Sequence, residues 1–198
     1  MHILSGPIDT MSDVAEAVDL NQTAGDIVIL SAADSDLNCL VRANSKTSSK
    51  TPSLRLANLT KLGHNLSVDI YCEKIISSAK IIIIRLIGGV SYWPYGLEQV
   101  RNTARQTGAK LVIVPGDDKN DPQLTSYSNT SPDVIDRIWA YFINGGVGNA
   151  LNLLKYAGTL IGYESKWKEP APILQAGLYW PSLEYPGISE LEQFWVYG

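Results

Sequence analysis

The chain has 198 residues, of which 45% are hydrophobic and 18% charged, so it can bury the core of an ordinary α/β domain and is not a disordered chain. Its 16 Lys and Arg against 20 Asp and Glu give a net charge of −4, which disfavours a nucleic-acid-binding role. The apolar run Ile81–Ile84 is far shorter than the about 20 residues that cross a bilayer. The stretch "MHILSGPIDT" has no basic start followed by a long apolar segment, so a secretory signal is not expected. Cys39 and Cys72 are therefore expected to be free thiols in a reducing cytoplasm.

Short apolar runs alternate with helix-like segments, a pattern typical of βαβ units and a parallel sheet. The predicted strands lie near Met1–Leu4, Ile27–Ser31, Ser67–Tyr71, Ile81–Ile87 and Leu111–Pro115. The second and fourth of these are continuous apolar runs, so helices should cover both of their faces. The expected fold class is α/β, Rossmann-like or flavodoxin-like.

Helices are predicted over Asp36–Ala43, Leu54–Leu62, Cys72–Ser78 and Gly96–Thr107. The last is the clearest, because Leu97, Val100 and Ala104 share one face and Gly108 follows its end. The helix Leu54–Leu62 is expected to end at a left-handed Gly63, and His64 to interact with that helix end.

The chain divides into four predicted parts. Residues 1–130 form the parallel α/β domain, and 131–162 form a helical pair packed on it, opened by Ser131 as N-cap and Pro132. Residues 163–172, "YESKWKEPAP", are read as a linker. Residues 173–198 begin a second α/β unit with a strand near Ile173–Trp180, and too few residues follow to complete it.

Three strand ends carry polar or glycine-rich residues, and in a parallel sheet such ends share the edge where ligands bind. Gly88 and Gly89 follow one strand and could let backbone N–H groups approach an anion. The pair lacks the GxGxxG and GxxxxGK[ST] patterns, so a simple turn is the favoured interpretation.

Four acidic residues fall at the same edge. Asp34, Asp36, Asp117 and Asp118 could form a carboxylate cluster for a hard cation. The favoured alternatives are that Asp34 and Asp36 cap the helix that follows, and that Asp117 and Asp118 are an exposed turn pair.

Arg85 is a charge at the end of a covered strand, and such a charge is costly unless it is paired. An internal carboxylate is the favoured partner, with a ligand or another domain as the alternative. Tyr92, Trp93 and Tyr95 could form a platform for a flat ligand, although core and rim packing is favoured. His2 and His64 show no metal-ligand spacing, and no catalytic residue or metal ligand is assigned.

Six phrases, in order along the chain, resemble the N-terminal region of the large subunit of cobaltochelatase (the CobN type), a family related to the H subunit of magnesium chelatase. They are "DIVILSAADSDL", "PSLRLANLTKLGHNLSVDIY", "RLIGGVSYWPYGLEQVR", "LVIVPGDDKNDPQL", "YFINGGVGNALNLLKY" and "AGLYWP".

This resemblance implies a part in inserting cobalt into hydrogenobyrinic acid a,c-diamide during aerobic cobalamin synthesis. The implied partners are the remainder of the large subunit, two AAA+-type subunits that use ATP and magnesium, and the corrinoid precursor. Because family members are several times longer, the chain is expected to be a fragment that holds no cofactor and is inactive alone. A non-catalytic scaffold that binds a tetrapyrrole or a partner, or a magnesium chelatase relative, remains the alternative.

Overall fold

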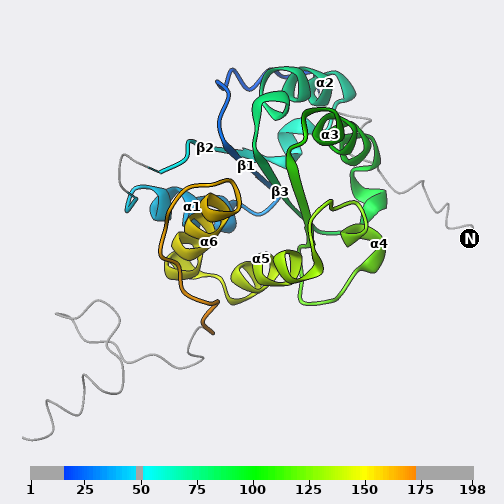
Figure 1. The fold of residues 1–198 in the computed structure, drawn as a ribbon. Coiled ribbons are helices and arrows are strands. Elements are labelled where there is room, and N and C mark those ends of the chain that lie inside the picture. The colour runs from blue at the N-terminus through cyan, green and yellow to red at the C-terminus, as the bar shows by residue number, and fades with distance from the viewer. Residues whose placement is uncertain (1–15, 48–50, 173–198) are drawn as a thin grey trace, which may run out of the picture.

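The computed structural model describes residues 16–47 and 51–172, which include a four-stranded parallel sheet with helices on both faces (Figure 1). The strands are β1 (Ile27–Ser31), β2 (Leu54–Asn58), β3 (Ile81–Leu86) and β4 (Lys110–Pro115), in the order β2-β1-β3-β4. The predicted α/β class is confirmed. The strands predicted near Met1–Leu4 and Ile173–Trp180 lie outside the described residues.

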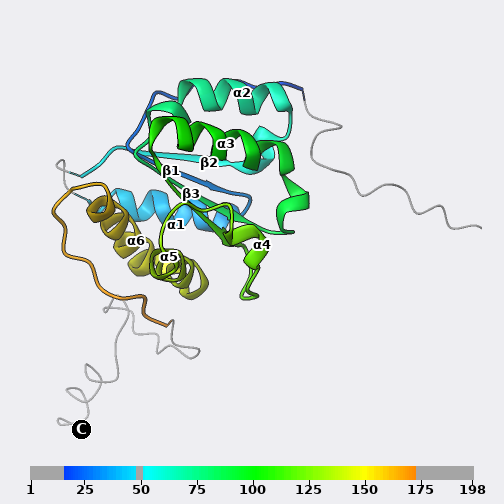
Figure 2. The same cartoon turned by 45° about the vertical axis from the view of Figure 1, so that its right-hand side comes forward.

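Helices lie on both faces of the sheet, as Figure 2 shows. One layer holds α1 (Asp34–Asn44), α5 (Pro132–Asn144) and α6 (Gly146–Leu160). The other holds α2 (Asn65–Lys74) and α3 (Pro94–Thr107), together with the short helices η1 (Leu59–Leu62), η2 (Ile76–Ser78), η3 (Val90–Tyr92) and α4 (Pro122–Thr125).

The two apolar strand runs are buried on both faces, as predicted. Alternate side chains enter different clusters, because successive residues of a strand point to opposite sides. Ile27, Ile29, Ile81 and Ile83 pack toward α1, α5 and α6, whereas Val28, Leu30, Ile82 and Ile84 pack toward α2 and α3. By the same alternation, the side chain of Arg85 lies on the same face of the sheet as Ile81 and Ile83.

The sequence-based assignment is wrong between residues 54 and 78. The predicted helix Leu54–Leu62 is strand β2 followed by η1, and the predicted strand Ser67–Tyr71 lies inside α2. The predicted helix Cys72–Ser78 covers only the end of α2 and η2. The helix α2 buries Val68, Tyr71 and Cys72, a spacing of three and four that belongs to one helical face.

Two smaller expectations about this region also fail. Gly63 is right-handed, with φ −70°, and does not close a helix in the left-handed region. His64 instead caps the start of α2, where its Nδ1 accepts a hydrogen bond from the backbone N–H of Leu66 at 3.1 Å.

The helix predicted at Gly96–Thr107 is confirmed as α3. Leu97, Val100 and Ala104 are buried, Pro94 opens the helix, and Gly108 follows it with φ +75°. The helical pair is confirmed as α5 and α6, with Ser131 at the N-cap position, although its side chain makes no capping hydrogen bond.

Both outer strands are covered along their free edges by side chains. At β4, Asn129 accepts from the backbone N–H of Leu111 at 2.6 Å and donates to the carbonyl of Ala109 at 2.8 Å. At β2, Gln22 donates to the carbonyl of Leu56 at 2.8 Å. These contacts occupy main-chain groups that could otherwise pair with another strand.

Candidate functional site

In this strand order, the connections that follow β1 and β3 lead to opposite sides of the sheet. From β1 the chain passes through α1 to β2 on one side, and from β3 it passes through α3 to β4 on the other side. Ligands of open parallel sheets bind outside the carboxyl ends of the strands at such a point. The residues that follow β1 and β3 are therefore the natural candidates for a site.

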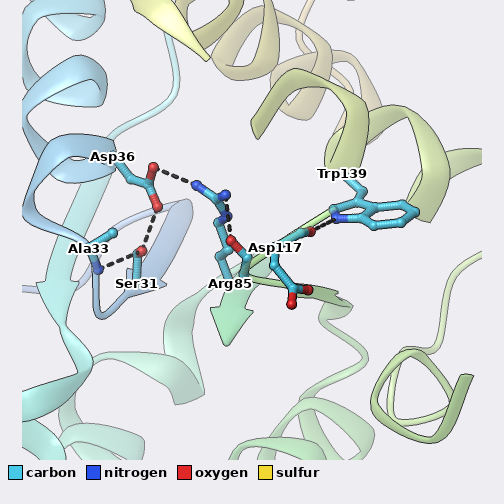
Figure 3. A network of polar contacts seen from close by, with 7 residues as sticks. Ser31, Ala33, Asp36, Arg85, Asp117 and Trp139 are labelled. Atoms are coloured by element: carbon cyan, nitrogen blue, oxygen red, sulfur yellow. Dashed lines mark hydrogen bonds and ion pairs between the residues drawn. The ribbon is translucent and has the colours of Figure 1, made fainter. Parts of the chain in front are cut away.

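Arg85 occupies this point (Figure 3). It is the register partner of Ser31 on β1, and its Nη1 lies 2.6 Å from Oδ1 of Asp36 in the first turn of α1. Its Nη2 donates to the carbonyl of Gly116 at 2.7 Å, and the guanidinium carbon lies 5.3 Å from the ring centre of Phe142 on α5. The partner of Arg85 is thus an internal carboxylate.

The pair is largely shielded from solvent. The Arg85 side chain is 14% exposed and that of Asp36 is 12% exposed. The second oxygen of Asp36 accepts from the Ser31 hydroxyl at 2.7 Å, and Ser31 in turn accepts from the N–H of Ala33 at 3.1 Å. Nε of Arg85 is buried without a hydrogen-bond partner. The network joins β1, α1, β3 and the loop after β4.

The expected capping role of Asp34 and Asp36 is wrong. Ala33 is the N-cap of α1, and no side chain makes a capping hydrogen bond there. Asp34 instead accepts from the side-chain amide of Asn58 at 2.7 Å, which ties the start of α1 to the end of β2. Asp36 serves Arg85 and Ser31, so each carboxylate is engaged with a neighbouring strand.

Gly88 and Gly89 form the turn after β3, with φ of +91° and +69°. Both conformations favour glycine, and a Cβ on Gly88 would meet the Cβ of Tyr92 at 3.3 Å. The backbone N–H of Tyr92 donates to the carbonyl of Gly89 at 3.2 Å. Helix α3 starts only at Pro94, which has no N–H to offer an anion.

The aromatic row after this turn is divided between core and rim. Trp93 is 3% exposed and donates from Nε1 to the carbonyl of Leu62 at 2.9 Å. Tyr92 is partly buried against the same core, and the hydroxyl of Tyr95 donates to Asp69 on α2 at 2.7 Å. Trp93 therefore belongs to the packing that was favoured from the sequence.

Asp117 and Asp118 are exposed in the turn after β4, as expected for a turn pair. The carbonyl of Asp117 accepts from Nε1 of Trp139 on α5 at 3.0 Å, whereas its carboxylate points away from Arg85 in Figure 3. Within residues 16–47 and 51–172 no three His, Cys, Asp or Glu side chains are grouped to hold a metal ion.

Three participants in the network were missed from the sequence: Ser31, the carbonyl of Gly116 and Phe142. A polar residue that ends an apolar strand, as Ser31 does, is a usable signal for the first of them. The sequence carries no such signal for the other two. A carbonyl is present at every residue, and Phe142 has the pattern of an ordinary core position on α5.

Hollows lie at both ends of the sheet. A cavity of about 150 Å³ beside Asp36 is walled by α1 and by the α5–α6 corner, including Cys39, Phe142 and Gly146. A groove of about 440 Å³ lies at the opposite end of the sheet, next to Ile27 and Leu54. In the described part of the chain no helix is long and apolar enough to span a membrane.

Comparison with known proteins relates the chain to one enzyme. It is 40% identical over 190 residues to the aerobic cobaltochelatase subunit CobN of a Sinorhizobium species, a match that covers 96% of this chain and 15% of that subunit. It is 38% identical over 163 residues to CobN of Pseudomonas aeruginosa, covering 82% of this chain and 13% of that one. No protein-family model matches.

A solved structure agrees at the level of the fold. The catalytic subunit of cobaltochelatase from Mycobacterium tuberculosis superposes with a TM-score of 0.60 over 81% of this chain and 12% of that subunit, at 24% identity. The resemblance drawn from the sequence is thereby confirmed: the chain is homologous to a segment of the cobaltochelatase subunit CobN that makes up 13–15% of that subunit's length.

Proposed function

We propose that the chain is the N-terminal domain of the large subunit of an ATP-dependent cobaltochelatase, which inserts cobalt into hydrogenobyrinic acid a,c-diamide in aerobic cobalamin synthesis. The observation that supports this proposal is the 40% identity across 96% of the chain. Cobalt and the corrinoid precursor are the substrates of the complete enzyme, and ATP and magnesium are used by its partners. Since the chain spans about 15% of its relative, we expect it to be inactive alone.

We infer that this domain contributes packing and docking rather than chemistry. The arrangement between β1 and β3 supports this role, because Arg85, Asp36 and Ser31 are bonded to one another where a parallel sheet would otherwise receive a ligand. Its partners would be the remainder of the large subunit and, through it, two AAA+-type subunits.

We place this function in the cytoplasm. Cys39 and Cys72 are both free thiols, as is usual in a reducing compartment. Burial raises the pKa of the Cys72 thiol to about 11, which keeps it protonated and unreactive near neutral pH.

The test is a chimera. The homologous segment of the Sinorhizobium subunit is replaced by this chain, the AAA+-type partners are added, and cobalt insertion is followed by the absorbance of the corrinoid. We expect the chimera to insert cobalt and a subunit that lacks the segment to fail. A folded chimera that assembles with its partners and inserts no cobalt would contradict the proposal.

A non-catalytic scaffold that binds a tetrapyrrole or a partner, including one of magnesium chelatase type, is the second candidate. It is favoured by Ile87, which is 53% exposed directly before the Gly88–Tyr92 loop. Titration of the 198-residue chain with the corrinoid precursor, followed by tryptophan fluorescence, separates the two. Saturable quenching supports the scaffold, and a flat titration at high micromolar ligand removes tetrapyrrole binding.

A further inference from the structure

Residues 163–171 run back along α6, in the direction opposite to that helix (Figures 1 and 2). At the start of this segment the ring of Tyr163 lies under the ammonium of Lys80 at 5.5 Å, and the backbone N–H of Tyr163 donates to the carbonyl of Gly158 at 3.0 Å. At the far end Ala171 meets Asn149, in the first turn of α6. The segment thus spans most of the helix.

Side chains of α5 and α6 form hydrogen bonds with the main chain of the segment. The Asn149 side chain accepts from the N–H of Ala171 at 3.0 Å and donates to its carbonyl at 2.7 Å. Asn152 accepts from the N–H of Lys168 at 2.9 Å, and the hydroxyl of Tyr141 donates to the Lys168 carbonyl. These four hydrogen bonds involve only backbone groups of the segment, so they depend on its extended conformation and not on its side chains.

Asn149 is built for this contact. The residue is 7% exposed, and a buried amide without partners would cost free energy. Its oxygen is satisfied by Ala171, and its nitrogen is shared between Ala171 and the carbonyl of Gly145 at 2.8 Å. Paired donation and acceptance is how a neighbouring strand would bind, here supplied by one side chain.

Two side chains of the segment add anchoring contacts. Trp167 packs edge-on against Tyr156 with ring centres 4.7 Å apart, and the guanidinium of Arg137 lies 5.1 Å from the Trp167 ring. Nε of Arg137 is 2.9 Å from a carboxylate oxygen of Glu169. Pro170 and Pro172 favour an extended backbone, which lowers the entropy cost of holding it.

We propose that α5 and α6 form a groove that recognises extended main chain, and that residues 163–171 are its occupant in the same chain. The segment, here called the strap, is then a fixed connector and not a flexible linker. It begins beside Lys80, at the start of β3, and returns the chain to the start of α6, whose Gly146 borders the cavity next to Asp36. This inference does not depend on the proposed function.

Amide hydrogen exchange by NMR on the 198-residue chain tests the strap. We expect the amides of Lys168 and Ala171 to be protected, because each donates to a side chain of α6. Asn149→Ala removes the acceptor of the Ala171 amide, and Trp167→Ala removes the ring contacts with Tyr156 and Arg137. Each variant should raise the two exchange rates about tenfold relative to that of Ile83 in the sheet. The ratio to Ile83 removes any change in global stability.

Lys166→Ala is the matched control, because Lys166 is an exposed residue of the same segment and its side chain makes none of these contacts. It should leave both amides protected. Unprotected exchange at Lys168 and Ala171 in the unmodified chain would overturn the proposal. Unchanged rates relative to Ile83 in both variants would overturn it as well.

Discussion

Arg85 on β3 and Asp36 on α1 are joined at 2.6 Å across the point where the connections of the sheet diverge. Their separation of 49 residues makes this a long-range contact that fixes α1 over the sheet. Because both side chains are mostly buried, neither can regain water without moving the elements that carry it.

Replacement of Arg85 by methionine should therefore destabilise the chain. Asp36 would keep its hydrogen bond from Ser31 but lose its counter-charge in a shielded position, a situation that typically costs about 3–5 kcal/mol. Urea unfolding of the unmodified and Arg85→Met chains measures the loss.

The control is Arg105→Met, at an exposed position in the last turn of α3, which should change stability by less than about 0.5 kcal/mol. Adding Asp36→Asn to Arg85→Met should restore part of the loss, because the unpaired charge is then removed. A cost for Arg85→Met no larger than that of the control would mean that the pair does not hold the fold.

The helices and strands predicted correctly are those whose local sequence pattern matches their burial in the fold. The runs in β1 and β3 are apolar because both faces are covered, and α3 carries its apolar face and its closing glycine within its own segment. The prediction failed at β2, an edge strand whose half-exposed Leu54 and Leu56 continue toward Leu59 and Leu62 in a helix-like pattern. Strand formation there depends on β1, which is remote in sequence.

The candidate site shows the same limit. The sequence indicated that Arg85 needs a partner, but the choice of Asp36 among the acids at that edge follows from the register of β3 beside β1. The contacts of residues 163–171 could not be predicted, since side chains that bind a remote main chain leave no local pattern.

Asp26 should make stability depend on pH in the acid range. Its carboxylate accepts from Lys80 and from the side chain and backbone of Ser53, which lowers its pKa to about 2 from 3.8. A lowered pKa in the folded state gives stability that is present above pH of about 4 and lost as the pH falls toward 2. Because Lys80 is half exposed, we expect a contribution of about 1 kcal/mol.

Urea unfolding at pH 6, 4 and 2 checks this prediction. Asp26→Asn should be less stable than the unmodified chain at pH 6 and should lose less between pH 4 and 2. Asp118→Asn, at an exposed turn position, should follow the unmodified chain throughout. Equal acid sensitivity of the Asp26→Asn and unmodified chains would contradict the assignment.

Asn129→Ala should weaken the cover of the free edge of β4. The variant loses both hydrogen bonds to the main chain at Leu111 and Ala109, and we expect a cost of about 1–2 kcal/mol together with a tendency to self-associate through the edge. Urea unfolding and sedimentation velocity measure the two effects. Asn120→Ala, exposed in the same connection, is the control and should remain as stable and as monodisperse as the unmodified chain.

Gly96→Ala should report on the buried position of Trp93. A Cβ on Gly96 would lie 1.9 Å from Cε2 of Trp93, whose ring is packed in the core and bonded to the carbonyl of Leu62. The indole would have to shift and weaken that bond, and such overpacking costs about 1–3 kcal/mol. Gly148→Ala is the matched control, since its Cβ would meet nothing within 4 Å in helix α6 and alanine favours a helix by up to about 1 kcal/mol. Thermal unfolding should therefore show a lower midpoint for Gly96→Ala and a higher one for Gly148→Ala.

If Gly96→Ala were as stable as Gly148→Ala, the indole of Trp93 would not occupy the space beside Gly96. The turn at Gly88 and Gly89 would then have to be reconsidered with the indole turned outward.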